Sequence, residues 1–379
     1  MHQRSFLCER PRPQLPRRLL LGTSPPPIAG RPDACGGRDA ARAGVAVKVR
    51  VTQLDGKLPN LALMRLAAWH RSQGDAVFWE RGIARQLYEP DYDVVYGSAI
   101  FATTAKAVEL FRKQWPQAIV GGSGGDSALR VEDIVPTQFT GLDYSGYPNF
   151  DGSIGYAMRG CRFKCGFCVV PKQEGKARFN QTIAQIWRGP NFPKHLHLLD
   201  NDFFGNPEWR STVAAINEGE FRVCINQGIN VRLLDEEQAA AIASMRVMDD
   251  QFRRRQVYTA WDNIGDEAVF FRGIDRLEGA GVPPKAIMVY MLVGYDPRET
   301  WERIWHRFNR MVDRGVLPYP MVHDRFQKQD PKHWRKLKQF QRWVVRNYYK
   351  MIPFEAYRSG LQKPDERQVD FLAITGEAA

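Results

Sequence analysis

The sequence has few cysteines, no long apolar run and no internal repeat. Its six cysteines are spread over 379 residues and three of them are clustered, so they form no even-numbered disulfide framework of the kind found in small secreted domains. No stretch reaches the roughly 18 to 20 uninterrupted apolar residues of a membrane-spanning helix. We therefore expect a soluble protein of a reducing, cytoplasmic compartment, without contact with membranes.

Acidic residues are also in deficit. The chain has 54 Lys and Arg against 42 Asp and Glu, a net charge of +12, which favours anionic partners such as nucleic acid, nucleotides or an acidic redox protein. Part of the excess lies in residues 1–46, which are rich in Arg, Pro and Gly and lack periodicity, so we expect a disordered leader there. A targeting peptide and a misassigned start codon, with folding from near Val47, both remain open explanations.

Residues 47–130 alternate between strand and helix patterns. The strand-like runs are VKVRVTQL, YDVVYGSAIF and QAIVGG, and the helical runs are NLALMRLAAWHRSQG and TAKAVELFRKQW. This order predicts a parallel sheet in a small, doubly wound, Rossmann-like α/β domain. Residues 131–150 carry Pro and Gly without a sustained period, and we interpret them as a linker.

A second α/β domain is predicted over residues 151–320. The strand-like runs are SIGYAMRG, HLHLLDNDFF, FRVCINQGINVRLL, RQVYTAWDN and AIMVYMLVG, with helical patterns between them. The repeated order predicts a parallel sheet, either open or closed into a barrel.

Residues 321–379 are basic and aromatic, and we expect a helical C-terminal extension. The residues at helical spacing are Trp334, Leu337, Phe340, Val344 and Tyr348. A packing helix with a solvated charged face is the simpler interpretation. Nucleic-acid contact is the alternative, although base stacking would need exposed aromatic side chains.

Three cysteines lie within eight residues, in GCRFKCGFCV. Cys161, Cys165 and Cys168 have the spacing C-x-x-x-C-x-x-C, with polar and basic residues between them that suit thiolates. Structural zinc normally takes four ligands, and no fourth lies nearby. A [4Fe-4S] cluster held by three cysteines leaves one iron open to a small molecule. Structural zinc and three unrelated buried thiols are the alternatives.

This loop resembles the signature of the radical S-adenosylmethionine (SAM) family, including the aromatic Phe167 just before the third cysteine. The resemblance covers roughly residues 151–320 and implies a partial (β/α)6 TIM-type barrel. It implies that SAM binds the open iron, that reductive cleavage yields a 5′-deoxyadenosyl radical, and that the radical removes a hydrogen atom from a substrate. A low-potential electron donor, flavodoxin or ferredoxin, is implied as a partner.

The resemblance also implies SAM-binding positions at later strand ends. Asp200 and Asp202 end the second strand of this domain, and Asp262 with Asn263 ends a later one, where family members bind the ribose. Arg232 is a candidate for the SAM carboxylate. Gly294 opens the run Gly294, Pro297, Glu299 and Thr300, which matches the order near adenine in relatives. The alternatives are helix capping for Asp200 and Asp202, a turn for Asp262 and Asn263, and an ordinary surface position for Arg232. Glu299 and Thr300 are alternatively the start of the following helix, where a carboxylate complements the helix dipole.

The first domain resembles the cobalamin-binding domain of B12-type radical SAM proteins. Ser98, Gly121 and Gly122 stand where that fold contacts the corrin, but the D-x-H-x-x-G motif with the cobalt-ligating histidine is absent. His70 is expected on a helix surface. Cys8, Cys35 and Cys224 are poorly arranged for a second cluster, so a single cluster is expected.

The leading hypothesis is therefore a single-cluster radical SAM enzyme with a substrate that the sequence does not identify, either an anionic molecule or RNA. The alternatives are a cobalamin-dependent radical SAM methyltransferase and a non-catalytic RNA-binding protein with a structural metal loop.

Overall fold

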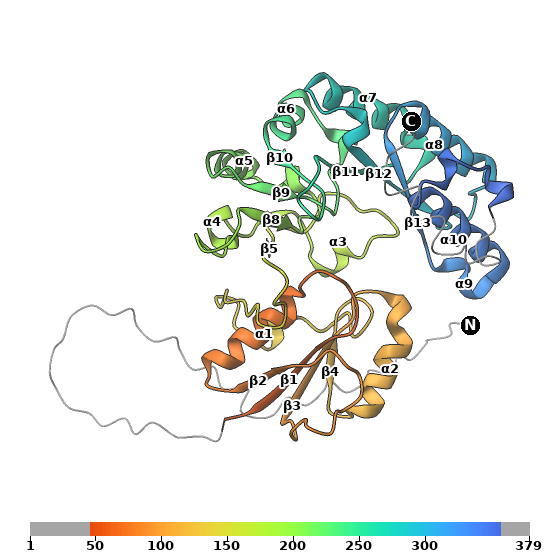
Figure 1. The fold of residues 1–379 in the computed structure, drawn as a ribbon. Helices are drawn as coiled ribbons and strands as arrows, with labels where there is room; N and C mark the ends of the chain where they lie inside the picture. The colour runs from red at the N-terminus through yellow and green to blue at the C-terminus, as the bar shows by residue number, and fades with distance from the viewer. Residues whose placement is uncertain (1–45, 358–379) are drawn as a thin grey trace, which may run out of the picture. The chain divides into compact units, whose positions relative to one another are not determined.

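The computed structural model describes residues 46–357, which form two compact units, one ending at Phe150 and the other beginning at Asp151 (Figure 1). The predicted leader, except Ala46, lies outside the described residues, as do Cys8, Cys35 and residues 358–379 of the predicted C-terminal extension. Within residues 46–357, no helix has the length and apolar character needed to cross a membrane.

The first unit is a four-stranded parallel sheet in the order β2-β1-β3-β4. Its elements are β1 (Lys48–Gln53), α1 (Leu61–Ser72), β2 (Ala76–Trp79), β3 (Val94–Ser98), α2 (Ala105–Gln114) and β4 (Ile119–Gly121). The two helices pack on opposite faces of the sheet, because alternate strand residues point to opposite faces: Val94 belongs to the cluster with α1 and Val95 to the cluster with α2. The layout is compatible with a Rossmann-like fold. The four-residue strand β2 was not predicted.

Residues 131–150 carry little regular structure, as a connection does, but they belong to the first unit. Arg65 of α1 donates hydrogen bonds to the carbonyl oxygens of Pro136 and Phe139, each at 2.8 Å. The Tyr147 hydroxyl donates to Gln53 Oε1 at 2.5 Å. The predicted linker is thus packed against the end of β1 and the side of α1.

A buried ion pair lies at the centre of the first unit. Arg50 of β1 donates from Nε to Glu89 Oε2 at 2.9 Å, and the two side chains are 0% and 1% exposed. Arg50 also donates to Thr52 Oγ1 and to the Gly82 carbonyl oxygen, and its guanidinium lies 4.7 Å from the Trp115 ring centroid. These contacts satisfy a charge that burial would otherwise make very costly.

The second unit contains two parallel sheets. One has the order β10-β9-β8-β5 and the other β11-β12-β13, and a single parallel bridge joins Ile229 to Thr259 of β11. A short antiparallel pair, β6-β7, flanks the cysteine loop. The strands are β5 (Ser153–Gly155), β6 (Met158–Arg159), β7 (Arg178–Phe179), β8 (His195–Leu198), β9 (Arg222–Cys224), β10 (Arg246–Val247), β11 (Val257–Ala260), β12 (Ile287–Val293) and β13 (Leu317–Val322).

Helices follow most of these strands. They are α3 (Val170–Gln173), α4 (Ile183–Ile186), α5 (Trp209–Glu218), α6 (Glu236–Ser244), α7 (Glu267–Gly279), α8 (Trp301–Asp313), α9 (Arg325–Gln329) and α10 (Pro331–Val345). The predicted α/β class with parallel strands is confirmed.

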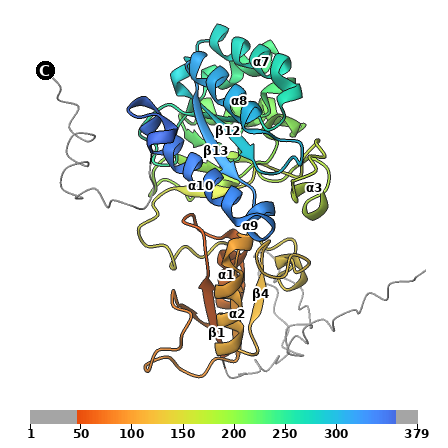
Figure 2. The same ribbon diagram turned by 90° about the vertical axis from the view of Figure 1, so that its right-hand side faces the viewer.

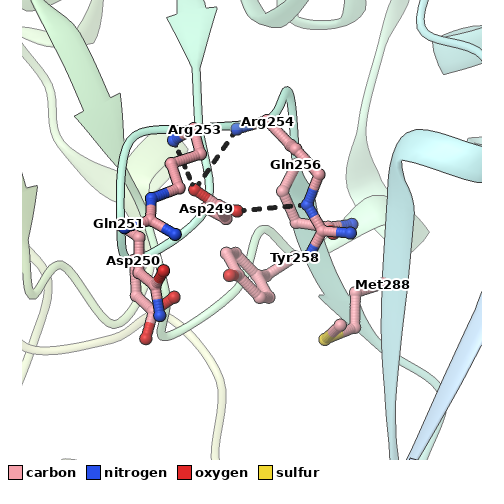
Figure 3. Close-up of a pocket in the computed structure, with 8 residues that line it drawn as sticks. All are labelled: Asp249, Asp250, Gln251, Arg253, Arg254, Gln256, Tyr258 and Met288. Carbon is pink, nitrogen blue, oxygen red and sulfur yellow. Dashed lines mark hydrogen bonds and ion pairs between the residues drawn. The ribbon is translucent and has the colours of Figure 1, made fainter. Parts of the chain in front are cut away.

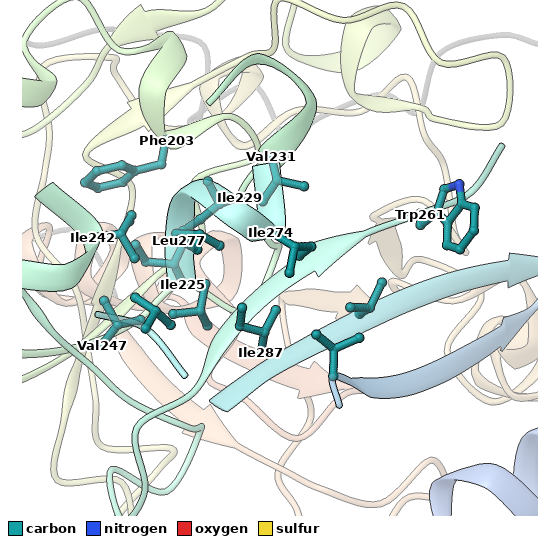
Figure 4. Packing of buried hydrophobic residues seen from close by; sticks show 14 of the residues in the cluster. Phe203, Ile225, Ile229, Val231, Ile242, Val247, Trp261, Ile274, Leu277 and Ile287 are labelled. Atoms are coloured by element: carbon teal, nitrogen blue, oxygen red, sulfur yellow. The ribbon is translucent and has the colours of Figure 1, made fainter. Parts of the chain in front are cut away.

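The side chains of β12 alternate between a face packed in the core and a face that borders a cavity. Along β12, Ile287, Val289 and Met291 are buried in the core, whereas the residues between them are half-buried. Figure 4 shows part of this core, including Ile287 of β12 and Ile274 of α7. Because the side-chain period of a strand is two, Leu292 and Ala260 point away from the helices, and both line the cavity described below.

The C-terminal helices belong to the core of the second unit. Leu337, Phe340 and Val344 of α10 are buried in the same cluster as the strands, and α10 packs against β13 (Figure 2). The predicted stripe therefore marks a packing helix. Strand β13 was missed because Pro318 and Pro320 argue against a strand. It pairs with β12 alone among the described strands, so the missing amide donors cost no ladder bond.

Glu89→Gln should lower the free energy of unfolding of the first unit by roughly 3 kcal/mol or more, because Arg50 would keep a buried charge without its counter-ion. The matched control is Asp91→Asn in the Arg85–Asp91 pair, where the Asp91 side chain is 93% exposed. That change should cost less than about 1 kcal/mol. Urea unfolding of the full chain measures both. Equal losses would show that the buried pair does not stabilise this unit.

Candidate functional site

A cavity of about 580 Å³ lies in the second unit, at the carboxyl ends of its parallel strands. Its lining comes from the cysteine loop and from the segments that follow β8, β9, β11 and β12. The lining residues used below are Cys161, Phe163, Cys165, Gly166, Phe167, Cys168, Arg232, Asp262, Asn263, Tyr295, Glu299, Arg303, Arg307 and Arg325. The three cysteines and four of the seven predicted cofactor-binding residues, Phe167, Arg232, Asp262 and Asn263, are therefore brought together.

The cysteine loop is closed at its base by backbone contacts. Arg159 pairs with Arg178 in the β6-β7 ladder, and the Cys161 amide donates to the Gly175 carbonyl oxygen at 3.2 Å. Gly160 has a φ of +83°, and a Cβ there would lie 2.2 Å from the Lys176 carbonyl oxygen. Only glycine combines this backbone angle with so close an approach. The shape of the loop is therefore set by contacts within the protein.

The three cysteines of the loop are free and half-buried. The pKa of Cys161 is raised to about 11, chiefly by burial, with contributions from Asp202, Cys168 and Cys165. Burial also raises the pKa of Cys168, and Cys165 and Asp262 add to the effect. The thiols therefore influence one another electrostatically. Within residues 46–357, no three His, Cys, Asp or Glu side chains are arranged to hold a metal ion as they stand. Metal binding to thiols requires their deprotonation.

Asp200 and Asp202 hold the loop from the end of β8. Asp202 is buried and accepts from the Arg162 amide at 3.0 Å and from Arg162 Nε at 2.8 Å. Asp200 is fully buried and accepts from the amides of Ala157 and Met158 at 2.8 and 3.2 Å. Neither residue lines the cavity. Both side chains therefore accept hydrogen bonds from the segment around the first cysteine.

Asp262 and Asn263 follow β11 and line the cavity. Asp262 accepts from the Leu292 amide at 2.9 Å, and its burial raises its pKa. The Asn263 side chain caps the next turn by accepting from the Gly265 amide at 3.0 Å. Both the polar lining and the predicted turn are thus present at this strand end.

Arg232 follows β9 and makes its own contacts at the cavity. It donates to Asp266 Oδ2 at 2.8 Å and to Asn230 Oδ1 at 3.1 Å, and its guanidinium lies 5.3 Å from the Phe163 ring centroid. The side chain is 29% exposed, so it is neither a free surface arginine nor fully sequestered.

Gly294 shapes the end of β12 rather than the cavity wall. It has a φ of +79°, and its amide donates to Glu299 Oε2. Thr300 caps α8 by accepting from the Arg303 amide, so it lies at the start of the following helix, as the alternative predicted. Glu299 lines the cavity, as does Pro297, while Gly294 does not.

Arg307, which was not among the predicted site residues, links the ends of β11 and β12. It is 1% exposed and donates to the carbonyl oxygens of Trp261 and Leu292 at 3.0 and 2.9 Å, and also to Glu299. The sequence pattern could have marked Arg307 as a buried charge. It lies on the apolar face of α8 with Ile304, Phe308 and Met311, where a charge needs buried partners.

Aromatic residues border the cavity on the side of the cysteines. Phe167 and Tyr295 meet edge to face with ring centroids 5.5 Å apart, and a Cβ at Gly166 would lie 2.8 Å from Tyr295 Oη. Arg325 donates to the Tyr295 carbonyl oxygen at 3.0 Å. Phe163, Tyr295 and Arg325 had no motif that could have marked them.

The candidate corrin contacts of the first unit are used in packing. Ser98 Oγ accepts from Asn60 Nδ2 at 2.9 Å, and a Cβ at Gly122 would lie 2.2 Å from the Ala99 carbonyl oxygen. The prediction that His70 lies on a helix surface is wrong. It is 1% exposed, and its ring nitrogens contact Asp75 Oδ2 at 2.7 Å and Tyr96 Oη at 3.1 Å.

A second, more polar pocket of about 460 Å³ lies beside the loop that joins β10 to β11 (Figure 3). Asp249 accepts from the Arg253 amide at 2.8 Å and from Arg254, while Tyr258 and Met288 contribute apolar surface. Its one buried carboxylate is already paired, so the pocket offers no unpaired buried polar side chain for a ligand.

Comparison with known proteins gives no match: no protein-family model fits the chain, and neither a curated protein nor a solved structure is detectably similar to it.

Burial of Asp200 predicts a pH-dependent stability. Burial raises its pKa to about 7, against about 3.9 in an unfolded chain. Between these values the folded protein keeps a proton that the unfolded chain has lost. The free energy of unfolding should therefore fall as pH rises from about 4 to about 7, by up to about 1.4 kcal/mol per pH unit, and then level off.

Urea unfolding of the wild type and Asp200→Asn at several pH values from 4.5 to 8 tests this. The variant has no carboxyl to titrate at this position, so the wild type should lose stability relative to the variant up to about pH 7. Parallel profiles would contradict a titrating Asp200.

Proposed function

We propose that this chain is a radical SAM enzyme with a single [4Fe-4S] cluster, which generates a 5′-deoxyadenosyl radical for hydrogen abstraction. The observation that supports this best is the convergence at one cavity of Cys161, Cys165 and Cys168 with Asp262 and Arg232, residues separated by up to about a hundred positions in the sequence. Three thiols together with polar and charged side chains around one cavity are what such a cofactor pair requires.

The three cysteines are the proposed ligands of three irons, which leaves the fourth iron for the amino and carboxylate groups of SAM. When bound, the cluster supplies the electron that cleaves SAM into methionine and the 5′-deoxyadenosyl radical. The protein's part is to hold and orient these groups and to exclude competing hydrogen donors.

Each group of cavity residues has its own proposed role. Arg232 is proposed to pair with the SAM carboxylate, because its guanidinium lies at the cavity beside the cysteine loop's Phe163. Asp262 and Asn263 are proposed to receive the ribose hydroxyls. Asp200, Asp202 and Gly294 act indirectly in this proposal, since they shape the loop and the strand end that the cofactors contact.

The proposed fold of the second unit is a partial (β/α)6 barrel. It is supported by the parallel order within each sheet and by the Ile229–Thr259 bridge between them. We propose this chemistry without cobalamin, because Ser98 and Gly122 are engaged within the first unit and His70 is held by Asp75 and Tyr96.

The substrate is proposed to carry an anionic group. Arg303 and Arg325 line the cavity, and each donates only to a backbone carbonyl oxygen among the side-chain hydrogen bonds of the described residues. A low-potential carrier, flavodoxin or ferredoxin, is the proposed electron donor.

Cys165→Ala should lose the iron–sulfur absorption after anaerobic reconstitution with iron and sulfide, together with all 5′-deoxyadenosine formation on reduction by dithionite in the presence of SAM. Cys224→Ala is the matched control, because Cys224 is also a free thiol but is buried away from the cavity lining. It should keep both. Iron analysis, electron paramagnetic resonance and nucleoside release measure the outcome. Iron and cleavage retained in Cys165→Ala, or stoichiometric zinc in the wild type, would contradict the proposal.

A further inference from the structure

The segment that contains the three cysteines has a strong charge imbalance. We define the cysteine-loop surface as the exposed side chains of residues 161–179. That segment has five basic residues and one acidic residue, Glu174, a net charge of +4. The basic residues are Arg162, Lys164, Lys172, Lys176 and Arg178.

The fold uses few of these charges. Arg162 is paired with Asp202, and Glu174 lies 3.5 Å from Arg159. Among the ion pairs of residues 46–357 there is none to Lys164, Lys172 or Lys176, and all three are exposed. Arg178 donates to backbone carbonyl oxygens of its own segment. Like charges gathered without partners raise the energy of the free protein and attract an anionic surface.

Apolar side chains are exposed among these charges. Val169 and Phe179 are 48% and 39% exposed, and neither lines the cavity. Protein-binding surfaces commonly combine exposed apolar side chains with a charged rim. The surfaces used in transient redox contacts are small.

We propose that the cysteine-loop surface is the docking site of an acidic one-electron carrier protein, an inference that rests on the proposed function. The residues that would hold the electron-accepting centre belong to the same loop, so a carrier seated here approaches that centre closely. Complementary charge raises the association rate and orients the carrier without requiring a tight complex. In the transfer, the carrier loses one electron and the centre gains it, with no bond made or broken.

The test uses the full chain, reconstituted with iron and sulfide, and a purified acidic flavodoxin as the probe. The variant is Lys172→Glu/Lys176→Glu, which avoids the residues between the cysteines. The control is Lys194→Glu/Lys285→Glu, which makes the same change in charge. Both lysines are exposed and lie next to the amino ends of β8 and β12, whereas the cavity lies at the carboxyl ends.

Flavodoxin should bind the wild type with an affinity that weakens as salt rises. The variant should bind at least about tenfold more weakly and show a similar loss in flavodoxin-driven 5′-deoxyadenosine formation at low salt, whereas the control should match the wild type. After complete reduction by dithionite, all three proteins should cleave SAM equally.

Three outcomes would overturn the inference. Equal flavodoxin binding by variant and wild type would remove the docking role. Loss of dithionite-driven cleavage in the variant alone would mean that the lysines serve the centre itself. Binding of single-stranded RNA, but not flavodoxin, to these lysines would make the surface a nucleic-acid site. If flavodoxin binds as expected and no protein cleaves SAM with dithionite, the proposed function fails while the docking surface stands.

Discussion

The candidate site depends on two buried carboxylates at the end of β8. Asp202 is bound by Arg162, and Asp200 by the amides of Ala157 and Met158, so the end of one strand anchors the chain on its way into the cysteine loop. The contact between Asp202 and the Arg162 guanidinium is charge-assisted and therefore stronger than a neutral hydrogen bond, and no water can replace the two amide donors of the buried Asp200 side chain. These contacts hold the chain on both sides of Cys161.

A second buried charge organises the rest of the cavity. Arg307 of α8 binds the carbonyl oxygens that end β11 and β12, and through Glu299 it reaches the amide of Gly294. Carbonyl groups at strand ends have no ladder partner, so a buried guanidinium with several donors satisfies them at once. The helix therefore stabilises both the core, through its apolar face, and the outline of the cavity.

Residues that were expected to contact a cofactor thus separate into two groups. Phe167, Arg232, Asp262 and Asn263 line the cavity, while Asp200, Asp202 and Gly294 shape its walls from behind. The sequence pattern could not distinguish these groups, because a polar residue at a strand end has the same signal whether it faces a ligand or a neighbouring backbone amide. Only the positions of the amides, set by tertiary packing, separate the two.

By itself, the sequence determined the α/β class, most of the strands and longer helices, and the packing face of α10, because these depend on local periodicity of side chains. It also singled out the three cysteines, because their spacing is local. Tertiary structure decided that strand β13 forms despite two prolines, that His70 is buried, that residues 131–150 pack on the first unit, and that Arg307 is a central residue of the site. Each of these depends on which partner a residue meets, and partners distant in the chain are selected by the burial of the core and the pairing of its strands.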